Sequence, residues 1–108
     1  MQAVFRALSD AKRRDILILL SQQDMTIGDV VDQFDITRAA VKKHLKILEE
    51  GNLISVHSRG RERINRLEPH AFKPATEWLT FFNQFWDSHL TQLKHVIENG
   101  EKNEQHND

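Results

Sequence analysis

Apolar residues repeat at helical spacing through the first third of the chain and predict three short helices. The first is expected over residues 2–8. Asp10 is a good N-cap for the second helix, which should continue to about Ser21. Thr26 can cap the third helix, over residues 27–34, where apolar residues again recur every three or four positions.

The next helix, from Thr37 to Glu50, places apolar and basic residues on two different faces. Thr37 is a suitable N-cap, and the pair Gly51-Asn52 tolerates the left-handed backbone with which many helices end. With the helix before it, this segment predicts a helix-turn-helix, in which the second helix enters the major groove of double-stranded DNA. Val41, Leu45 and Leu48 form the apolar stripe, and Arg38, Lys42, Lys43 and Lys46 form the basic face.

After Asn52 the period changes from helical to alternating, which predicts a β-hairpin. Its strands are expected over residues 53–56 and 64–67, and Gly60 offers the positive φ that a hairpin turn needs. A hairpin that directly follows a helix-turn-helix is a wing. Its turn carries arginines that can contact phosphates or enter the minor groove. These are Arg59, Arg61 and Arg63.

A long helix is expected from Ala75 to about Asn99, with Gly100 at its end, after a kink or break near Phe72-Lys73 caused by Pro74. Its apolar residues cover more surface than so small a domain can bury, so we expect a second copy of the chain to cover the rest. The residues expected at this dimer interface are Val4, Phe5, Trp78, Phe82, Phe85, Trp86, Leu90, Leu93, Val96 and Ile97.

These elements together predict a mainly α-helical fold with a small β-hairpin: a winged helix-turn-helix followed by a long dimerisation helix. The length suits one small domain over residues 1–98. Residues 99–108 are polar and are expected to form a disordered tail. No apolar run approaches the ~20 residues that span a membrane, and the start does not resemble a signal peptide, so we expect a cytoplasmic protein.

Charge is distributed unevenly, although the net charge is only −1. Between Thr37 and Arg66 there are eight basic and three acidic residues, so this window carries +5 and the rest of the chain −6. Such a basic block within an acidic chain is typical of a surface that binds a polyanion. The chain has no cysteine, which excludes disulfides, thiolate metal sites and cysteine nucleophiles.

Several segments carry recognisable motifs. Residues 8–17 read Leu-Ser-Asp-Ala-Lys-Arg-Arg-Asp-Ile-Leu, and residues 41–48 read Val-Lys-Lys-His-Leu-Lys-Ile-Leu. Over roughly residues 3–98 the chain resembles the ArsR/SmtB-type bacterial winged helix-turn-helix repressors, whose corresponding motifs are L-S-D-P-T-R-x-x-I-L and V-S-x-H-L-x-x-L. Further similar segments are Gly51 to Ile54, the wing turn Arg59-Gly60-Arg61, Arg66 to Pro69, Trp78-Leu79 and Phe85-Trp86, the later ones typical of the branch without metal ligands.

This resemblance implies a homodimeric repressor, paired through its first and last helices, that binds an inverted repeat in its own promoter region. Two departures from the family pattern are Lys42, where serine is usual, and Asn52, where glycine is usual. His44 is either a DNA contact or a residue at the boundary of the core. The residues expected at DNA are Thr37, Arg38, Ala39, Lys42, Lys43, His44, Lys46, Arg59, Arg61 and Arg63.

Metal sensing is widespread in the family, but the residues here do not favour it, and we expect no cofactor. The third helix lacks the thiolate motif. The pairs Asp87-x-His89 and His95-x-x-Glu98 resemble the terminal-helix zinc pattern, yet five residues separate them where the family has ten. Five fewer residues rotate the second pair by roughly 140° about the helix axis. We therefore predict no metal site, with these four residues as weak candidates.

Other readings remain open at this stage. Lys12, Arg13 and Arg14 either are ordinary solvated charges or approach a phosphate backbone. The aromatic residues of the last helix could line a pocket for an effector, although such a stripe is more often core or interface. No catalytic constellation stands out, so an enzyme is not expected. The alternative function is a protein–protein interaction module, an anti-repressor with a degenerate winged helix. The operator, the regulated genes and the inducing signal do not follow from the sequence.

Overall fold

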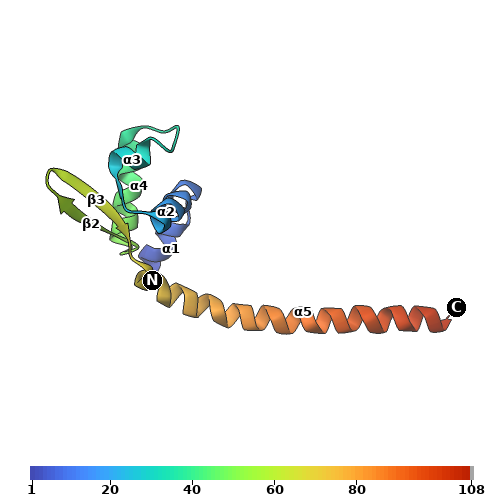
Figure 1. Cartoon of the computed structure of the whole chain (residues 1–108). Coiled ribbons are helices and arrows are strands. Elements are labelled where there is room, and N and C mark those ends of the chain that lie inside the picture. Colours follow the sequence, from blue (N-terminus) through green and yellow to red (C-terminus); the bar gives the residue numbers. More distant parts are fainter. Residues whose placement is uncertain (108) are drawn as a thin grey trace. The chain divides into compact units, whose positions relative to one another are not determined.

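The computed structural model describes the backbone of residues 1–107 and the side chains of residues 1–99. It forms two compact units, one comprising Met1–Ala75 and the other beginning at Thr76. The elements confirm the predicted mainly α-helical fold with a β-hairpin and a long last helix (Figure 1). They are α1 (Gln2–Leu8), α2 (Ala11–Gln22), β1 (Met25–Thr26), α3 (Ile27–Val31), α4 (Arg38–Glu50), β2 (Ile54–Arg59), β3 (Glu62–Leu67), the 3₁₀ helix η1 (Pro69–Phe72) and α5 (Lys73–Asn107).

Side-chain caps begin three of the helices at the predicted residues. The Asp10 carboxylate accepts hydrogen bonds from two backbone N–H groups at the start of α2. The hydroxyl of Thr37 accepts one from Ala40 at the start of α4. Thr26 and Asp29 form a reciprocal capping box at the start of α3. Each cap satisfies amides that the first turn leaves without a partner inside the helix, which is why these starts can be predicted from the sequence.

Helix α3 is shorter than predicted and ends at Val31 instead of Phe34. Beyond it the backbone hydrogen bonds connect residues three apart, with Gln33 donating to Val30 at 3.0 Å and Phe34 donating to Val31 at 3.2 Å. The chain therefore tightens into turns. Phe34 nevertheless packs against the core, half-buried, so the apolar spacing was read correctly while the end of the helix was wrong.

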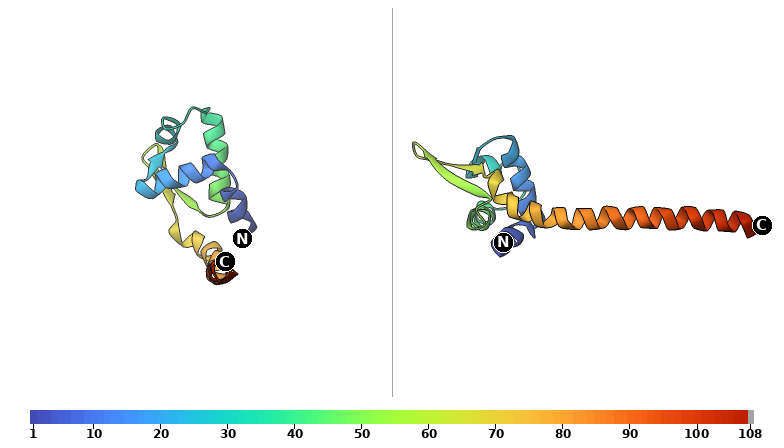
Figure 2. Two further views of the ribbon diagram at one scale, coloured as in Figure 1. Left: turned by 90° about the vertical axis from the view of Figure 1, so that its right-hand side faces the viewer. Right: turned by 90° about the horizontal axis from the view of Figure 1, so that it is seen from below.

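The sheet has three antiparallel strands in the order β1-β3-β2, and β1 was not predicted. Its pairs with β3 are Met25↔Asn65 and Thr26↔Ile64. The predicted hairpin of β2 and β3 is confirmed, with pairs from Ile54↔Leu67 to Arg59↔Glu62 and a turn at Gly60, whose φ is 62°. The hairpin extends away from the helices of its unit (Figures 1 and 2).

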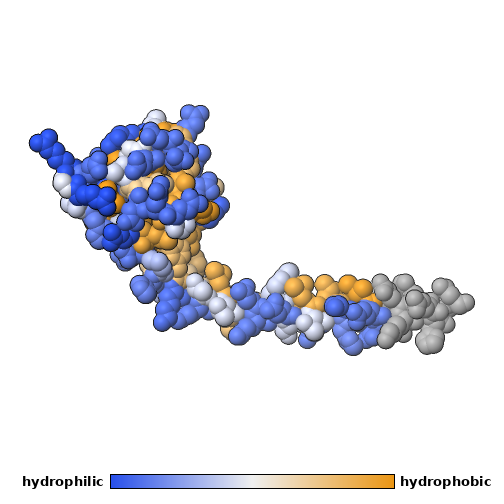
Figure 3. All heavy atoms as spheres, viewed as in Figure 1, coloured by the Kyte–Doolittle hydropathy of each residue, from blue (hydrophilic) through white to orange (hydrophobic). Residues whose placement is uncertain are grey.

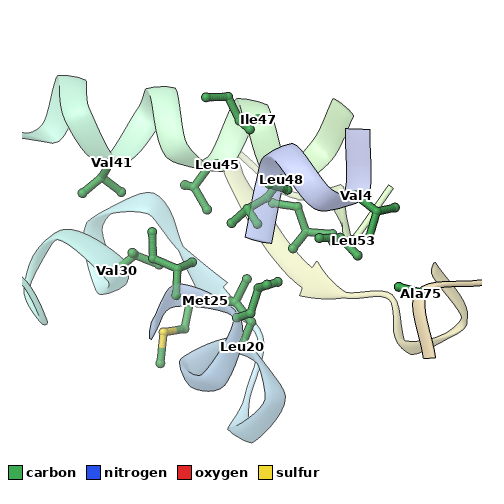
Figure 4. Close-up of a cluster of buried hydrophobic side chains, with 14 residues drawn as sticks. Val4, Leu20, Met25, Val30, Val41, Leu45, Ile47, Leu48, Leu53 and Ala75 are labelled. Atoms are coloured by element: carbon green, nitrogen blue, oxygen red, sulfur yellow. The ribbon is translucent and has the colours of Figure 1, made fainter. Parts of the chain in front are cut away.

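One apolar core holds the first unit together. Val41, Leu45 and Leu48 project from α4 toward buried residues of α2, β1 and α3 (Figure 4). Gly51 follows α4 directly, and a Cβ there would lie 3.0 Å from the carbonyl oxygen of Ala3, so the absence of a side chain lets α1 approach the end of α4. The predicted left-handed residue is Asn52, with φ 59°. Figure 4 labels Val4, Leu20, Met25, Val30, Leu53 and Ala75 among the other members of this core.

The second unit is the continuation of α5. Pro74 is the second residue of the helix and is tolerated there because the first-turn N–H groups need no partner within the helix. A kink or break was predicted near Phe72-Lys73; there η1 ends at Phe72 and α5 begins at Lys73, so the helix type changes from 3₁₀ to α with no residue between the two. The backbone continues past Gly100 to Asn107, so glycine does not end the helix; inside a helix it costs only about 1 kcal/mol relative to alanine. The side chains of residues 100–108 lie outside the described part, and both the tail over 99–108 and the domain over 1–98 stay predictions.

Among the described residues, no helix combines the length and apolar character that crossing a membrane requires.

Candidate nucleic-acid interface

Helix α4 presents its predicted basic face to solvent. The apolar stripe of the helix is buried. Of the positions on this helix that were expected to contact DNA, all except His44 are exposed. Acidic residues appear only in its last turn. The exposed residues of this face, with the N-cap, are Thr37, Arg38, Ala39, Lys42, Lys43 and Lys46.

The arginines of the hairpin turn are exposed as well. Arg59 lies opposite Glu62 at the end of the ladder, Arg61 stands in the turn, and Arg63 is the next basic residue along β3. In the described part of the chain none of the basic side chains of α4 or of this turn takes part in an ion pair. Arg66, in contrast, pairs with Asp24 at 3.0 Å. The structure therefore places two groups of available cations in one unit.

His44 lies apart from these exposed residues. Its ring is half-buried, and Nδ1 is 3.3 Å from a guanidinium nitrogen of Arg13 on α2. Because a guanidinium only donates hydrogen bonds, this ring nitrogen is the acceptor. Lys42 and His44 are separated by about 200° around the helix, so they cannot share the groove-facing side. Of the two readings left open by the sequence, the geometry favours a residue at the boundary of the core.

Arg13 has a structural role that the sequence did not reveal. Only 8% of the residue is exposed, and it donates from Nε to the carbonyl of Ala7 at 2.8 Å and from Nη2 to the carbonyl of Arg6 at 2.9 Å. Arg14 donates to the carbonyl of Leu8 at 2.7 Å. The last carbonyls of a helix lack partners within it and carry partial negative charge, so two cations stabilise the end of α1.

The remaining basic residue of that segment, Lys12, lies with its ammonium 5.7 Å from the ring centre of Phe34.

Through its hydrogen bonds, Arg13 links α1, α2 and α4, and it does not point at a phosphate backbone. One signal in the sequence could have indicated this role of Arg13. The residue lies at the start of α2, where a cation is unfavourable for the dipole of its own helix but can stabilise the C-terminal end of an adjacent helix.

The Asp10 carboxylate is the described group whose pKa is clearly perturbed. The backbone N–H of Arg13, followed by that of Lys12 and the nearby positive charges, lowers the pKa of Asp10 below its ordinary value of 3.8, while partial burial opposes the shift. The carboxylate is thus held ionised as the cap of α2.

Helix α5 carries a broad exposed apolar surface. At 100° per residue, its apolar side chains from Trp78 to Ile97 fall within about half of the helix circumference. They are exposed by 43% or more, and some rings contact one another: Trp78 and Phe82 have centroids 4.6 Å apart, and Phe85 and His89 4.0 Å apart. Orange, apolar residues lie open on this helix in Figure 3. The members that were expected at a dimer interface are Trp78, Phe82, Phe85, Trp86, Leu90, Leu93, Val96 and Ile97.

The two expected interface residues of α1 differ from each other. Val4 is only 8% exposed and belongs to the core of the first unit, which leaves little of it for a partner. Phe5 is 37% exposed. An effector pocket lined by the aromatic residues of α5 stays a prediction.

The weak metal candidates do not come together in the described part of the chain, where no three His, Asp or Glu side chains form a group that could hold a metal ion. His89 donates from Nδ1 to the carbonyl of Phe85 at 3.1 Å, and His95 lies 3.0 Å from the amide nitrogen of Asn99. Asp87 and Glu98 stand on the same exposed helix.

Comparison with known proteins agrees with this geometry. The family model described as "Bacterial regulatory protein, arsR family" matches residues 10–56, from the cap of α2 into β2. The transcriptional repressor SdpR of Bacillus subtilis (strain 168) is 36% identical over 90 residues, which cover 83% of this chain and 100% of that protein. The HTH-type transcriptional regulator Rv2034 of Mycobacterium tuberculosis (strain ATCC 25618 / H37Rv) is 28% identical over 94 residues, covering 87% and 85%.

A solved structure shows the same fold. The crystal structure of an ArsR family transcriptional regulator, RHA00566, superimposes with a TM-score of 0.71 at 31% identity, over 81% of this chain and 90% of that one. The family predicted from the sequence motifs is thereby confirmed. The chain belongs to the ArsR family of bacterial winged helix-turn-helix transcriptional regulators.

Proposed function

We propose that this regulator is a cytoplasmic homodimeric repressor that binds an inverted-repeat operator, with the DNA upstream of its own gene as the first candidate. The observation that carries the proposal is the set of exposed cations on α4 and on the β2–β3 turn, which have no ion-pair partner among the described residues. Without a bound polyanion, the positive charges of these seven side chains would have no protein counter-charge among the described residues of the unit. A DNA backbone supplies those charges, and the α4 side chains can also reach guanine O6 and N7. The activity is binding, without a catalytic step.

The proposed contacts differ between the two elements. Side chains of α4, led by Arg38 and Lys42, enter the major groove and read bases. Arg61 and its neighbours on the hairpin contact phosphates or the minor groove. His44, through its hydrogen bond with Arg13, positions α4 on the core instead of reading a base.

The exposed face of α5 supports the homodimer. Full burial of one large apolar side chain contributes about 1.5–3 kcal/mol, so a face with this many of them favours being covered. A second copy offers an identical face, and two-fold pairing is the commonest assembly of soluble proteins. The two recognition helices of such a dimer should meet half-sites about 34–36 Å apart or a multiple of that distance.

The test is a fluorescence-anisotropy titration of the full chain against the DNA upstream of its own gene, at two salt concentrations, with a random duplex as the reference. We expect tight, salt-sensitive binding by a dimer, unchanged by zinc or by a chelator. Lys42→Ala should weaken binding and relax the preference at one base position. Arg61→Ala should weaken binding to every sequence alike and lower the salt slope by about 0.9.

Lys12→Ala is the matched control, because it removes the same charge from outside the proposed face and should bind like the parent. Equal affinity for the upstream DNA and the random duplex would refute specific binding and support the interaction-module alternative. Parent-like binding by both Lys42→Ala and Arg61→Ala would refute the docking. Release of DNA by zinc would contradict the expectation that zinc leaves binding unchanged and would support a metal site on α5.

A further inference from the structure

A groove of about 570 Å³ runs between α4 and the β2–β3 hairpin, entirely within the first unit. Its size lies in the range of small-molecule sites. Apolar side chains from three elements line it: Ile27 of α3, Leu45 of α4 and Val56 of β2. Ile27 and Val56 are only half-buried, so the protein leaves apolar surface uncovered beside its basic face. Phosphates and base edges offer little apolar surface to cover it, and the groove therefore calls for another occupant.

The backbone explains why both walls face the groove. Val56 pairs with Asn65, and Arg63 lies two residues before Asn65, so the three side chains share one face of the hairpin. On α4, Lys42, Lys46 and Glu49 recur at i, i+4 and i+7 and share one side of the helix. The walls are held in place by the sheet register and by the buried stripe of α4.

The rim of the groove is cationic. Lys42, Lys43 and Lys46 stand on the α4 wall and Arg63 on the opposite wall, against a single carboxylate, Glu49. Apolar walls beneath a rim with an excess of positive charge complement a molecule with an apolar body and an anionic head. A guanidinium and an ammonium from opposite walls suit a carboxylate in particular.

We propose that this groove binds a medium-chain alkyl carboxylate, with its chain against Ile27, Leu45 and Val56 and its head between Lys46 and Arg63. This ligand and DNA exclude each other, because both use the same cations. The exclusion rests on the proposed function, whereas the binding does not. Occupation of the groove would thus release the operator, and the groove would be the site through which the regulator takes its signal.

The experiment titrates the full chain with hexanoate, octanoate and decanoate, using calorimetry for affinity and amide chemical shifts for location. We expect one site per chain, with a dissociation constant on the order of 0.1 mM for decanoate. Each added methylene should raise affinity up to about fourfold until the groove is filled. Shifts should be confined to α3, α4, β2 and β3. Octan-1-ol, which has the same chain without the charge, should bind at least about tenfold more weakly than octanoate.

Two variants test the charge argument. Glu49→Gln removes the rim carboxylate and should tighten octanoate binding severalfold. Glu50→Gln is the matched control, since Glu50 is the next residue, pairs with Arg6 at 3.8 Å and does not line the groove; it should leave the affinity unchanged. Val56→Thr, nearly isosteric, should weaken binding. Equal affinities for octanoate and octanol, no effect of Glu49→Gln, or shifts that map to α5 would each overturn the proposal.

The exclusion is tested by adding octanoate to the protein–DNA complex, where release at concentrations near its dissociation constant is expected. Octanoate binding that leaves DNA affinity unchanged would overturn the exclusion. DNA binding without octanoate binding would overturn the groove assignment while leaving the proposed function standing. Octanoate binding by a chain that binds no DNA would contradict the proposed function and support the groove assignment.

Discussion

Replacement of Arg13 by methionine should destabilise the first unit strongly. Methionine keeps the apolar stem and removes the guanidinium, which donates to the carbonyls of Ala7 and Arg6 from an almost fully buried position. A hydrogen bond to a charged group contributes about 1.5–3 kcal/mol. The carbonyl of Arg6 also accepts from the hydroxyl of Ser9 at 2.7 Å, so the loss falls mainly on Ala7. We therefore expect a cost of about 2–4 kcal/mol.

Urea unfolding, followed by circular dichroism, measures this effect. With a slope of about 1.5 kcal/mol per molar urea, the midpoint should fall by roughly 1.3–2.7 M. Arg14→Met is the control, because its exposed side chain makes a single hydrogen bond to the end of α1 and should cost less than about 1 kcal/mol. Both variants are compared at one protein concentration, because the midpoint of the proposed dimer would depend on it. Equal midpoints for the two variants would refute the structural role of Arg13.

Three further predictions test the backbone at two positions and one helix cap. Gly51→Ala should lower the free energy of urea unfolding by about 1–3 kcal/mol, because the new Cβ would meet the carbonyl of Ala3. Gly28→Ala is the control: its Cβ would make an ordinary contact at 3.7 Å, and it should stabilise the protein by about 0.5–1 kcal/mol. A Gly51→Ala variant that is more stable than Gly28→Ala would contradict the close approach of α1 to Gly51. The pKa of Asp10 is lowered in the folded protein, so the carboxylate contributes to stability above pH 3.8, and this contribution is lost as the pH falls through the folded pKa. Relative to Asp10→Asn, the parent should therefore lose free energy of unfolding below about pH 4. Parallel stability curves for the two proteins over this pH range would contradict the role of the Asp10 charge. Asn52→Val should cost about 1–2 kcal/mol because φ is positive there, whereas Asn52→Gly should not destabilise, and similar thermal midpoints for the two would be inconsistent with that backbone.

Local signals in the sequence predicted most of the fold. A cap acts within three residues of its own position, so Asp10 and Thr37 mark the starts of α2 and α4 whatever surrounds them. The turn at Gly60 and the left-handed Asn52 depend on similarly local preferences. The basic face of α4 follows from helical spacing alone, and the exposed side chains lie where that spacing puts them.

Features that depend on distant partners were missed. Two residues, Met25 and Thr26, are too short a run to show alternation, and their partner strand lies about 40 positions later. The role of Arg13 required knowledge of where α1 docks, because the same side chain on a free helix would be solvated. The neighbouring residue His44 illustrates the same limit: its spacing from Lys42 was visible, but its contact with α2 was not.

The two-residue strand β1 affects the motions of the elements that we propose to bind DNA, α4 and the β2–β3 hairpin. Its pairing with β3 closes a loop that contains all of α3 and α4 and the whole of β2, because the paired residues lie at both ends of that stretch. The hydrogen bond from Asn65 to the carbonyl of Met25 and the ion pair between Arg66 and Asp24 reinforce the same closure. The protein loses the conformational entropy of closing this long loop once, when β1 pairs with β3, and the enclosed elements can then pack together without a further loss from closing the same loop. We therefore expect the amide hydrogens of α4 and of the β2–β3 hairpin to exchange with solvent as one cooperative unit. Both elements would then be ordered together or unfolded together when the proposed operator binds.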